Sequence, residues 1–247
     1  MKLQVLLVSL LCAGSVFAQD KPINVTIPVV PQGVNSAVFS APRGEWFQRA
    51  LSANARARAA AEPIRLIFDG DSITDGWQGN GKEVWAERYG KLNAFDFGIG
   101  GDRTQHVLWR LDQGQVDGLK PSLIALMIGT NNTGSNTPEE IAEGVKTIIA
   151  EYQKRCPEAV ILLQAVFPRG EKADNPIRAK VKAINELISK FGDNKKVLYV
   201  DFGDKFLEAD GSISPEIMKD FLHPTAKGYQ IWADAIAPIV AKYVPAK

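Results

Sequence analysis

The sequence predicts a three-layer α/β/α fold of the flavodoxin-like type, in which helices cover both faces of about five parallel strands. Short apolar runs of strand length alternate with amphipathic stretches of helical spacing along most of the 247 residues. The apolar runs are almost continuous, as expected for strands that are buried on both faces of a parallel sheet. Because a β/α barrel needs about eight such repeats, the smaller number favours an open sheet.

The predicted elements follow one another in a regular order. Residues 45–60 form a lead-in helix, because Trp46, Phe47, Ala50 and Leu51 recur at helical spacing. The predicted strands are 64–68, 94–98, 123–128, 160–167 and 197–202. The predicted helices between and after them are 84–89, 104–111, 138–155, 177–191 and 225–243. Right-handed crossovers place such helices on both faces of the sheet.

The N-terminus has the pattern of an export signal that spans residues 1–18. Lys2 supplies the positive charge, residues 3–16 are mostly apolar, and Val16-Phe17-Ala18 offers a small-residue cleavage site. The apolar run is shorter than a membrane span, so we expect a secreted or periplasmic chain with no stable membrane insertion. Residues 19–44 are rich in proline, which predicts an extended arm that adds an edge strand and is not a domain of its own.

Residues 45–247 are enough to bury one core, and we expect a single domain. The arm either folds over this body or exchanges with a neighbouring copy in a homodimer. With 29 basic and 28 acidic side chains, the net charge of +1 indicates no nucleic-acid partner. Loss of the signal leaves Cys156 as the sole cysteine, so the domain needs no disulfide. One cysteine and two histidines cannot make the usual zinc site, and we expect neither a metal nor another cofactor.

Four loops at the predicted sheet edge carry chemically active side chains. Ligands of open α/β sheets bind beyond the carboxyl ends of the strands, so a site is expected among these loops. They are 69–74, 98–103 and 129–132 after the first three strands, and 220–224 before the last helix. Residues 98–103 resemble a dinucleotide-binding fingerprint but have Arg103 in place of its third glycine. The sequence therefore does not favour NAD binding.

Ser72 and His223 are a candidate nucleophile and base. A serine hydroxyl needs a base to take its proton, and that base needs a partner that fixes its tautomer. Pro224 keeps His223 out of the helix, and Asp220 lies three residues earlier, within reach of one ring nitrogen. The other histidine, His106, lies in an apolar helical pattern that favours a packed structural role. Structural roles remain as alternatives. Ser72 is also a typical helix N-cap residue, and the Asp220–His223 pair is also typical of an ordinary turn.

Candidate oxyanion donors come from two further loops. Gly100 and Gly101 are first explained by a tight turn with positive φ, but a free glycine N–H is also what an oxyanion hole requires. The side chain of Asn131 adds another N–H donor. The candidate nucleophile, base and oxyanion donors all lie in the loops at the predicted carboxyl edge of the sheet. Their occurrence together favours hydrolysis through an acyl-enzyme.

Several segments together carry a resemblance to a known family. They are Gly70-Asp71-Ser72, 97–111, Gly129-Thr130-Asn131-Asn132, 168–172 and 220–223. They resemble the SGNH, or GDSL-type, hydrolase superfamily, and within it the catalytic subunits of platelet-activating-factor acetylhydrolase Ib. The resemblance extends over residues 64–239 and implies the same three-layer fold.

The resemblance also implies roles for individual residues. Ser72 corresponds to the nucleophile, His223 to the base and Asp220 to its orienting carboxylate. The oxyanion hole maps to the backbone N–H groups of Ser72 and Gly101 and to the side chain of Asn131. The family's mechanism implies no metal.

The natural ester is predicted less directly. For an exported esterase of this kind we expect removal of O-acetyl groups from carbohydrates, with a small-molecule or glycan ester as the partner. Trp77 is expected to offer a sugar-stacking face. Asp71, Arg103 and Arg169 are further candidate substrate contacts, unless they pack in the core or form surface ion pairs. The alternatives are a lysophospholipase or lipid acyl esterase, and a catalytically silent glycan-binding module.

Overall fold

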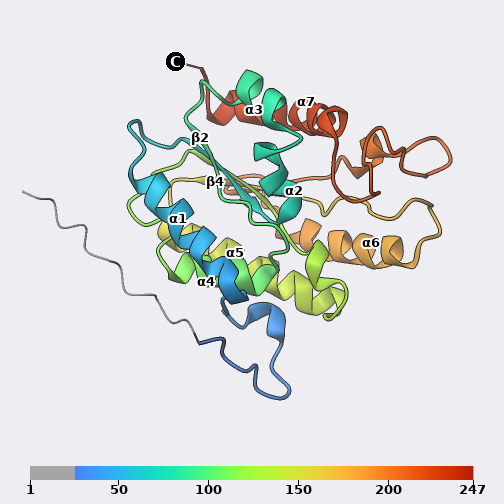
Figure 1. Ribbon diagram of the computed structural model, residues 1–247, viewed down its shortest axis with the longest axis horizontal. Helices are drawn as coiled ribbons and strands as arrows, with labels where there is room; N and C mark the ends of the chain where they lie inside the picture. Colours follow the sequence, from blue (N-terminus) through green and yellow to red (C-terminus); the bar gives the residue numbers. More distant parts are fainter. Residues whose placement is uncertain (1–25, 247) are drawn as a thin grey trace, which may run out of the picture.

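The computed structural model describes residues 26–246, which surround one parallel sheet of five strands (Figure 1). The strands are β1 Leu66–Gly70, β2 Ala94–Asp96, β3 Leu123–Met127, β4 Val160–Gln164 and β5 Val197–Val200. Their order across the sheet is β2-β1-β3-β4-β5, which confirms the predicted open α/β fold. The predicted export signal, residues 1–18, lies outside the described residues, as does the arm up to residue 25.

Helices cover both faces of the sheet (Figure 1). One layer consists of α1 Phe47–Arg58, α4 Thr104–Asp112, α5 Pro138–Arg155 and α6 Pro176–Ile188. The other layer consists of the short α2 Ser72–Asp75, α3 Lys82–Arg88 and α7 Ala226–Tyr243. Short 3-10 turns lie at Ser36–Val38, Gly44–Trp46, Gly76–Gln78, Thr130–Asn132, Ser189–Phe191 and Gly203–Phe206. Within residues 26–246, no helix combines the length and the apolar character that a membrane crossing requires.

The sheet buries a separate apolar core on each of its faces. Successive side chains of a strand point to opposite faces, so Ile67 packs on the side of α1, α4 and α5. Its neighbours Leu66 and Phe68 pack on the side of α3 and α7. All positions of β1, β3 and β4 are buried, which explains why their sequences are mostly apolar instead of alternating; the buried polar exceptions are Asp69 and Gln164.

Most predicted helices and strands have correct boundaries to within a few residues. Helix α5 begins at Pro138 as predicted, because Thr137 and Glu140 form a capping box there. Strand β1 begins and ends later than predicted and therefore includes Asp69. The prediction lacks α2, a single helical turn that starts at Ser72.

The described part of the arm packs against α4 and α5 and adds no strand to the sheet. Thr104 Oγ1 donates a hydrogen bond of 2.7 Å to the carbonyl of Ala37, whose side chain is completely buried. The Asn35 side chain donates to the Glu140 carbonyl at 3.1 Å. The expected edge strand is therefore wrong for residues 26–44. A proline-rich chain has few ladder donors and is held here through side-chain contacts instead.

Candidate active site

Ser72 lies at the turn where β1 ends and α2 begins. The turn passes very close to β3, since a Cβ at Gly70 would lie only 2.3 Å from the Met127 carbonyl oxygen. Asp71 caps the helix, and its Oδ1 accepts a hydrogen bond of 3.0 Å from the Ile73 N–H. This tight strand-to-helix turn holds Ser72 at the carboxyl edge of the sheet.

The Ser72 hydroxyl meets His223, which lies 151 residues later in the sequence. Ser72 Oγ is 2.9 Å from His223 Nε2, and His223 Nδ1 is 2.6 Å from Asp220 Oδ2. The other carboxylate oxygen of Asp220 accepts hydrogen bonds from the backbone N–H groups of Leu222 and His223, at 3.2 and 2.8 Å. The structure thus joins a hydroxyl, an imidazole and a carboxylate in the arrangement that activates a serine.

The loop that carries His223 is held by contacts to other parts of the chain. Phe221 has a φ of 59°, in the left-handed region that non-glycine residues rarely adopt. Its carbonyl accepts a hydrogen bond of 2.8 Å from the N–H of Gly170, in the loop after β4. Met218 and Pro224 form an isolated antiparallel bridge across the same loop. These contacts offset the cost of the Phe221 conformation and fix the position of the imidazole.

Asp220 is held in its ionised form. Partial burial opposes ionisation, but hydrogen bonds from the His223 ring and from backbone N–H groups outweigh it and lower the pKa of Asp220. An ionised Asp220 favours the tautomer in which His223 Nδ1 carries the proton. His223 Nε2 is then free to accept the proton of the Ser72 hydroxyl.

The loop after β2 brings Gly100 and Gly101 beside Ser72. A Cβ built on Gly100 would lie 3.8 Å from the Ser72 Cβ, and Gly101 has a φ of 79°. The Gly101 N–H has no acceptor within residues 26–246. The Asn131 side chain donates a hydrogen bond of 2.9 Å to the Asp102 carbonyl in this loop, and its second amide hydrogen remains for another acceptor. The predicted oxyanion donors are therefore close to one another and to Ser72.

A buried charged network lies beneath the nucleophile turn and the glycine loop. Arg110 Nη2 is 2.8 Å from Asp69 Oδ1, and Arg110 Nε is 2.9 Å from Asp102 Oδ2. Arg110 Nη2 also donates to the Gly70 carbonyl at 3.2 Å. Two further buried side chains complete the network around Asp69, namely Gln115 and Tyr152. Arg110 therefore ties the end of β1, just before Ser72, to the loop that carries Gly101.

Sequence reasoning missed this network, although a signal for it exists. Asp69 follows an apolar strand run, and Arg110 stands in an apolar part of α4. Buried charges are tolerated when they are paired, so each implies a partner, but the sequence does not show which one. Burial raises the pKa of Asp102 to about 6, although the nearby Arg110 opposes this shift.

The structure contradicts the expected roles of Trp77 and Asp71 as substrate contacts. The Trp77 ring is completely buried, with its centroid 5.7 Å from Phe68, 4.5 Å from Tyr229 and 4.9 Å from Trp232. The turn after α2 directs this ring into the core, so it offers no face to a sugar. Asp71 is 1% exposed and caps α2, and burial raises its pKa to about 7.

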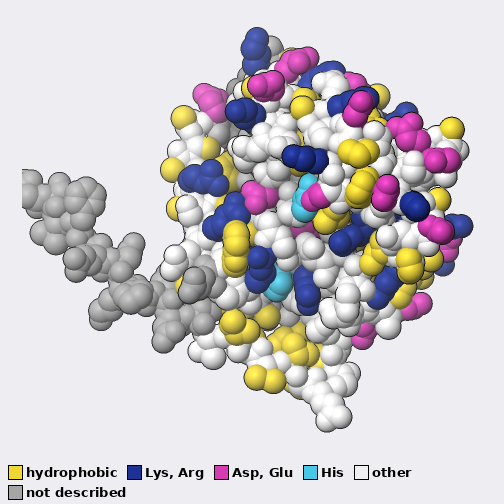
Figure 2. Space-filling view, turned by 45° about the vertical axis from the view of Figure 1, so that its right-hand side comes forward, with side chains coloured by type: hydrophobic (Ala, Val, Ile, Leu, Met, Phe, Trp, Pro, Cys, Tyr) yellow, Lys and Arg dark blue, Asp and Glu magenta, His cyan; other side chains and the backbone are white. Residues whose placement is uncertain are grey.

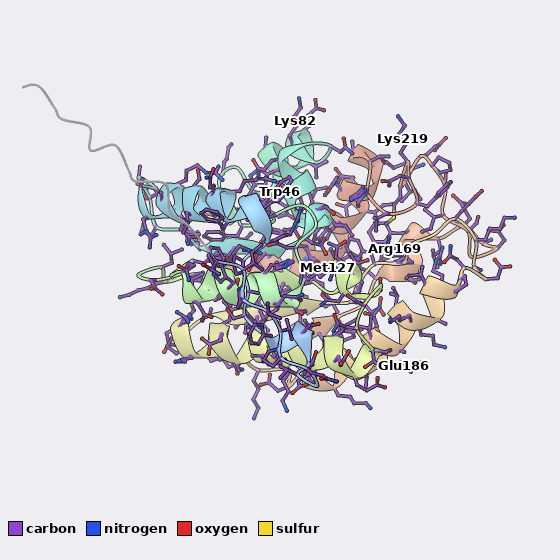
Figure 3. All side chains as sticks on the ribbon, turned by 60° about the horizontal axis from the view of Figure 1, so that its bottom comes forward. Trp46, Lys82, Met127, Arg169, Glu186 and Lys219 are labelled. Atoms are coloured by element: carbon purple, nitrogen blue, oxygen red, sulfur yellow. The ribbon has the colours of Figure 1, made fainter. Side chains whose placement is uncertain are left out.

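Arg103 and Arg169 lie half-buried on the active-site side of the molecule. Arg103 Nη1 donates to the Ser135 hydroxyl at 3.1 Å, and Arg169 Nη1 donates to Thr130 Oγ1 at 3.2 Å. Arg169 lies near the end of β3, where Met127 is labelled (Figure 3). It also lines a hollow of about 390 Å³ whose other walls include residues 220–222. Neither guanidinium forms a surface ion pair within the described chain.

His106 has a structural setting. It is half-buried, and its Nδ1 accepts a hydrogen bond of 3.0 Å from the Arg103 N–H at the start of α4. Burial, together with nearby arginines, lowers the pKa of His106 to about 3. A neutral, hydrogen-bonded imidazole agrees with the packed structural role favoured by the sequence.

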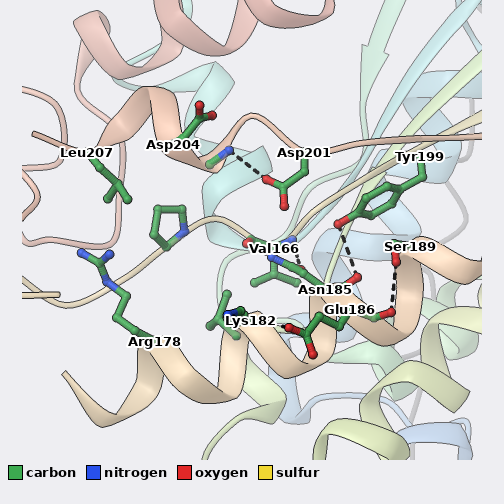
Figure 4. Close-up of a pocket in the computed structure, with 13 residues that line it drawn as sticks. Val166, Arg178, Lys182, Asn185, Glu186, Ser189, Tyr199, Asp201, Asp204 and Leu207 are labelled. Atoms are coloured by element: carbon green, nitrogen blue, oxygen red, sulfur yellow. Dashed lines mark hydrogen bonds and ion pairs between the residues drawn. The ribbon is translucent and has the colours of Figure 1, made fainter. Parts of the chain in front are cut away.

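A separate hollow of about 510 Å³ lies between α6 and the segment after β5 (Figure 4). Its lining includes Arg178, Tyr199 and Asp201, but neither Ser72 nor His223. This hollow is therefore separate from the candidate active site. In the part of the chain that the structure describes, no group of His, Cys, Asp and Glu side chains is arranged to hold a metal ion.

Comparisons with known proteins identify the family of this chain. The model of the GDSL-like lipase/acylhydrolase family matches residues 68–231. The chain belongs to this family. A relative of this GDSL-family protein is platelet-activating factor acetylhydrolase IB subunit alpha2 of Rattus norvegicus, 41% identical over 165 residues. The match covers 66% of this chain and 70% of the relative.

Solved structures show how widely the fold of this GDSL-family chain is shared. A GDSL-like lipase from Bacteroides thetaiotaomicron has a TM-score of 0.64 at 23% identity, covering 79% of this chain and 97% of the other. An acetyl xylan esterase has a TM-score of 0.61 at 21% identity, covering 72% of this chain and 100% of the other. The resemblance seen in the sequence motifs is confirmed, and the chain is a hydrolase by family.

Proposed function

We propose that this GDSL-family hydrolase is a serine esterase that cleaves short-chain esters, acetyl esters above all, through an acyl-enzyme. The observation that carries the proposal is the continuous contact of Ser72 Oγ with His223 Nε2 at 2.9 Å and of His223 Nδ1 with Asp220 at 2.6 Å. These distances suit proton transfer from the hydroxyl to the imidazole and orientation of the imidazole by the carboxylate.

The mechanism has two halves. Ser72 Oγ attacks the ester carbonyl carbon while His223 Nε2 takes the hydroxyl proton. The N–H groups of Ser72 and Gly101 and the free amide hydrogen of Asn131 stabilise the negative charge that develops on the carbonyl oxygen. His223 then gives its proton to the leaving alcohol, which leaves the acyl group on Ser72. In the second half, His223 deprotonates a water molecule that attacks the acyl-enzyme and releases the acid.

For the natural substrate we propose an O-acetylated carbohydrate, cleaved outside the cytoplasm. An acetyl group is named both for the relative at 41% identity and for the structurally similar acetyl xylan esterase. The side chains of Asp220 and His223 are 56% and 38% exposed, so the base is open to a bulky alcohol such as a sugar chain. The export signal predicted for residues 1–18 supports the proposal of a secreted or periplasmic location.

An acetylated phospholipid is the second candidate substrate. The 41% identity to a platelet-activating factor acetylhydrolase subunit favours it, since the acetyl xylan esterase at 21% identity shows only a shared fold. Both candidates use the same nucleophile and differ in the alcohol that is released.

The decisive experiment compares acyl groups and alcohols on the purified protein. Its substrates are 4-nitrophenyl esters of increasing chain length, acetylated xylan and an acetylated phospholipid. We expect the acetyl ester to be the fastest of the 4-nitrophenyl series, and acetate release from xylan to exceed release from the lipid. A preference for long acyl chains would contradict the acetylesterase, and faster release from the lipid would favour the second candidate.

A fluorophosphonate probe tests the nucleophile separately. It should label the wild type but not Ser72→Ala, because only an activated serine reacts. Ser189→Ala is the matched control, since the Ser189 hydroxyl only donates to the Glu186 carbonyl at 3.0 Å. Undiminished turnover by a folded Ser72→Ala protein would remove Ser72 from the mechanism.

A further inference from the structure

Three cations donate to uncharged oxygen atoms of one loop, residues 130–135, which includes Asn131. All three are half-buried, and none has a carboxylate within ion-pair distance in the described part of the chain. The contacts are Arg103 Nη1 to Ser135 Oγ at 3.1 Å, Arg169 Nη1 to the Thr130 carbonyl at 3.3 Å and Lys180 Nζ to the Thr133 carbonyl at 2.6 Å. We call Arg103, Arg169 and Lys180 the cationic rim.

The cationic rim lies next to the groups proposed to stabilise the oxyanion. Loop 130–135 includes Asn131, and Arg103 follows Gly101 by two residues. Arg169 lines the same hollow as Asp220, whose carboxylate is bound to His223. Both histidines of residues 26–246 are visible on one face of the molecule, with Lys and Arg side chains around them and Asp and Glu side chains beside the upper one (Figure 2). Arg103 and Arg169 therefore place positive charge beside the loops that carry the candidate oxyanion donors.

Carboxylates near the cationic rim cancel its charge only in part. Asp71 is 1% exposed, and burial raises its pKa to about 7. Asp220 is bound to the imidazole of the proposed base, and Asp102 is bound to a buried guanidinium. Loop 130–135 has no acidic residue. Glu171 is exposed and lines the same hollow as Arg169, so it opposes one of the three charges.

We propose that the cationic rim binds an anionic group, a carboxylate or a phosphate, which the substrate carries beside its ester. The proposal rests on the proposed esterase function, which supplies the cleavage site. A guanidinium has five N–H donors in a planar fork, and one contact to loop 130–135 leaves others for an oxyanion. The positive field also raises the local concentration of anionic esters, so their kcat/KM exceeds that of matched neutral esters.

Two acetyl esters with the same aromatic frame test the effect of substrate charge. They are 4-acetoxybenzoate, which is anionic, and methyl 4-acetoxybenzoate, which is neutral. The measured quantity is the ratio of their kcat/KM values, because the difference in intrinsic reactivity cancels when variants of the full chain are compared. Arg169→Gln or Arg103→Gln should each lower this ratio about two- to fivefold, as expected for one charge several ångströms away in partly aqueous surroundings.

Matched variants give opposite or no effects. Glu171→Gln removes a negative charge from the same hollow and should raise the ratio. Lys146→Gln removes an exposed positive charge from α5 and should leave the ratio unchanged. Added salt should lower the wild-type ratio, because the screening length falls to about 10 Å at 0.1 M salt.

Binding to Ser72→Ala, measured by calorimetry, reports on the rim without hydrolysis. This variant should bind 4-acetoxybenzoate more tightly than its methyl ester, and Arg169→Gln should remove that preference. The proposal would be refuted if Ser72→Ala bound the two esters equally and if neither salt nor the rim variants changed the kcat/KM ratio. If the wild type hydrolysed neither ester, the proposed esterase function would be contradicted instead. Calorimetry would still show whether the cationic rim binds the anionic ester.

The source of the anion is then distinguished with natural-type esters. An acetylated glucuronate presents a carboxylate, and an acetylated glycerol phosphate presents a phosphate. The ester whose kcat/KM falls more in Arg169→Gln carries the anion that the rim selects. If neither falls relative to Lys146→Gln, the rim does not bind substrate.

Discussion

Asp220→Asn is the sharpest test of the proposed mechanism, because it changes hydrogen bonding with almost no change of shape. An asparagine keeps an oxygen for the backbone N–H groups of Leu222 and His223, which Asp220 Oδ1 now binds at 3.2 and 2.8 Å. Its NH₂ group faces His223 Nδ1, which must then accept a hydrogen bond. The ring proton moves to Nε2, so the imidazole can no longer take the proton of the Ser72 hydroxyl.

The size of the effect follows from the exposure of the two side chains. In a fully buried triad, the change from aspartate to asparagine lowers kcat about 10⁴-fold. Here the Asp220 side chain is 56% exposed and that of His223 is 38% exposed, so water helps to solvate the charged imidazolium. We therefore expect a smaller loss in kcat of about 10²–10³-fold, equivalent to about 3–4 kcal/mol of transition-state stabilisation.

The assay is steady-state hydrolysis of 4-nitrophenyl acetate, with circular dichroism to verify folding. Asp210→Asn is the matched control, because Asp210 Oδ1 accepts from the Ser212 N–H at 2.9 Å in an exposed turn without a histidine. Asp210→Asn should keep wild-type kcat. A folded Asp220→Asn enzyme with wild-type kcat would refute the tautomer argument, and an equal loss in Asp210→Asn would assign the effect to the loop.

Three further predictions concern neighbouring residues. Asn131→Ala should lower kcat about 10²–10³-fold in a folded protein, because an oxyanion donor is lost; unchanged turnover would exclude this role. Trp77→Ala should lower the free energy of unfolding by about 3–5 kcal/mol, measured in urea, and leave KM for an acetylated sugar unchanged; a raised KM would restore the sugar-stacking role. Burial raises the pKa of Asp71 from its ordinary range to about 7, so the folded chain holds a proton that the unfolded chain releases. The stability that this group contributes therefore falls as the pH rises from about 4 to 7, and Asp71→Asn should flatten that fall in urea unfolding; an unchanged slope would contradict a raised pKa of Asp71.

The layered sheet could be predicted because it depends on a local pattern. Strands covered on both faces need apolar side chains at every position, and runs such as 123–128 show this directly. The start of α5 at Pro138 was also predictable, since Thr137 and Glu140 satisfy its first N–H groups. The arm was less predictable, because residues 26–44 attach through contacts to distant helices.

The closeness of Ser72, His223 and Asp220 was predictable for two different reasons. Asp220 and His223 are three residues apart, so their contact is nearly local. Ser72 is 151 residues from His223, and their closeness could be predicted only from the rule that the carboxyl ends of parallel strands meet at one edge of the sheet. The sequence supplies the residue types, and the topology supplies their meeting.

The sequence by itself determined the open α/β sheet, the family and the loops from which the site is built. Tertiary structure alone decided that Trp77 lies inside the core, that Arg110 joins Asp69 to Asp102, and that the arm docks on α4 and α5. The physical reason is that burial and the choice of a charged partner depend on which surfaces face each other after packing. A linear pattern gives the period of a helix or strand, but the neighbour that its side chains meet is set by contacts between segments far apart in the chain.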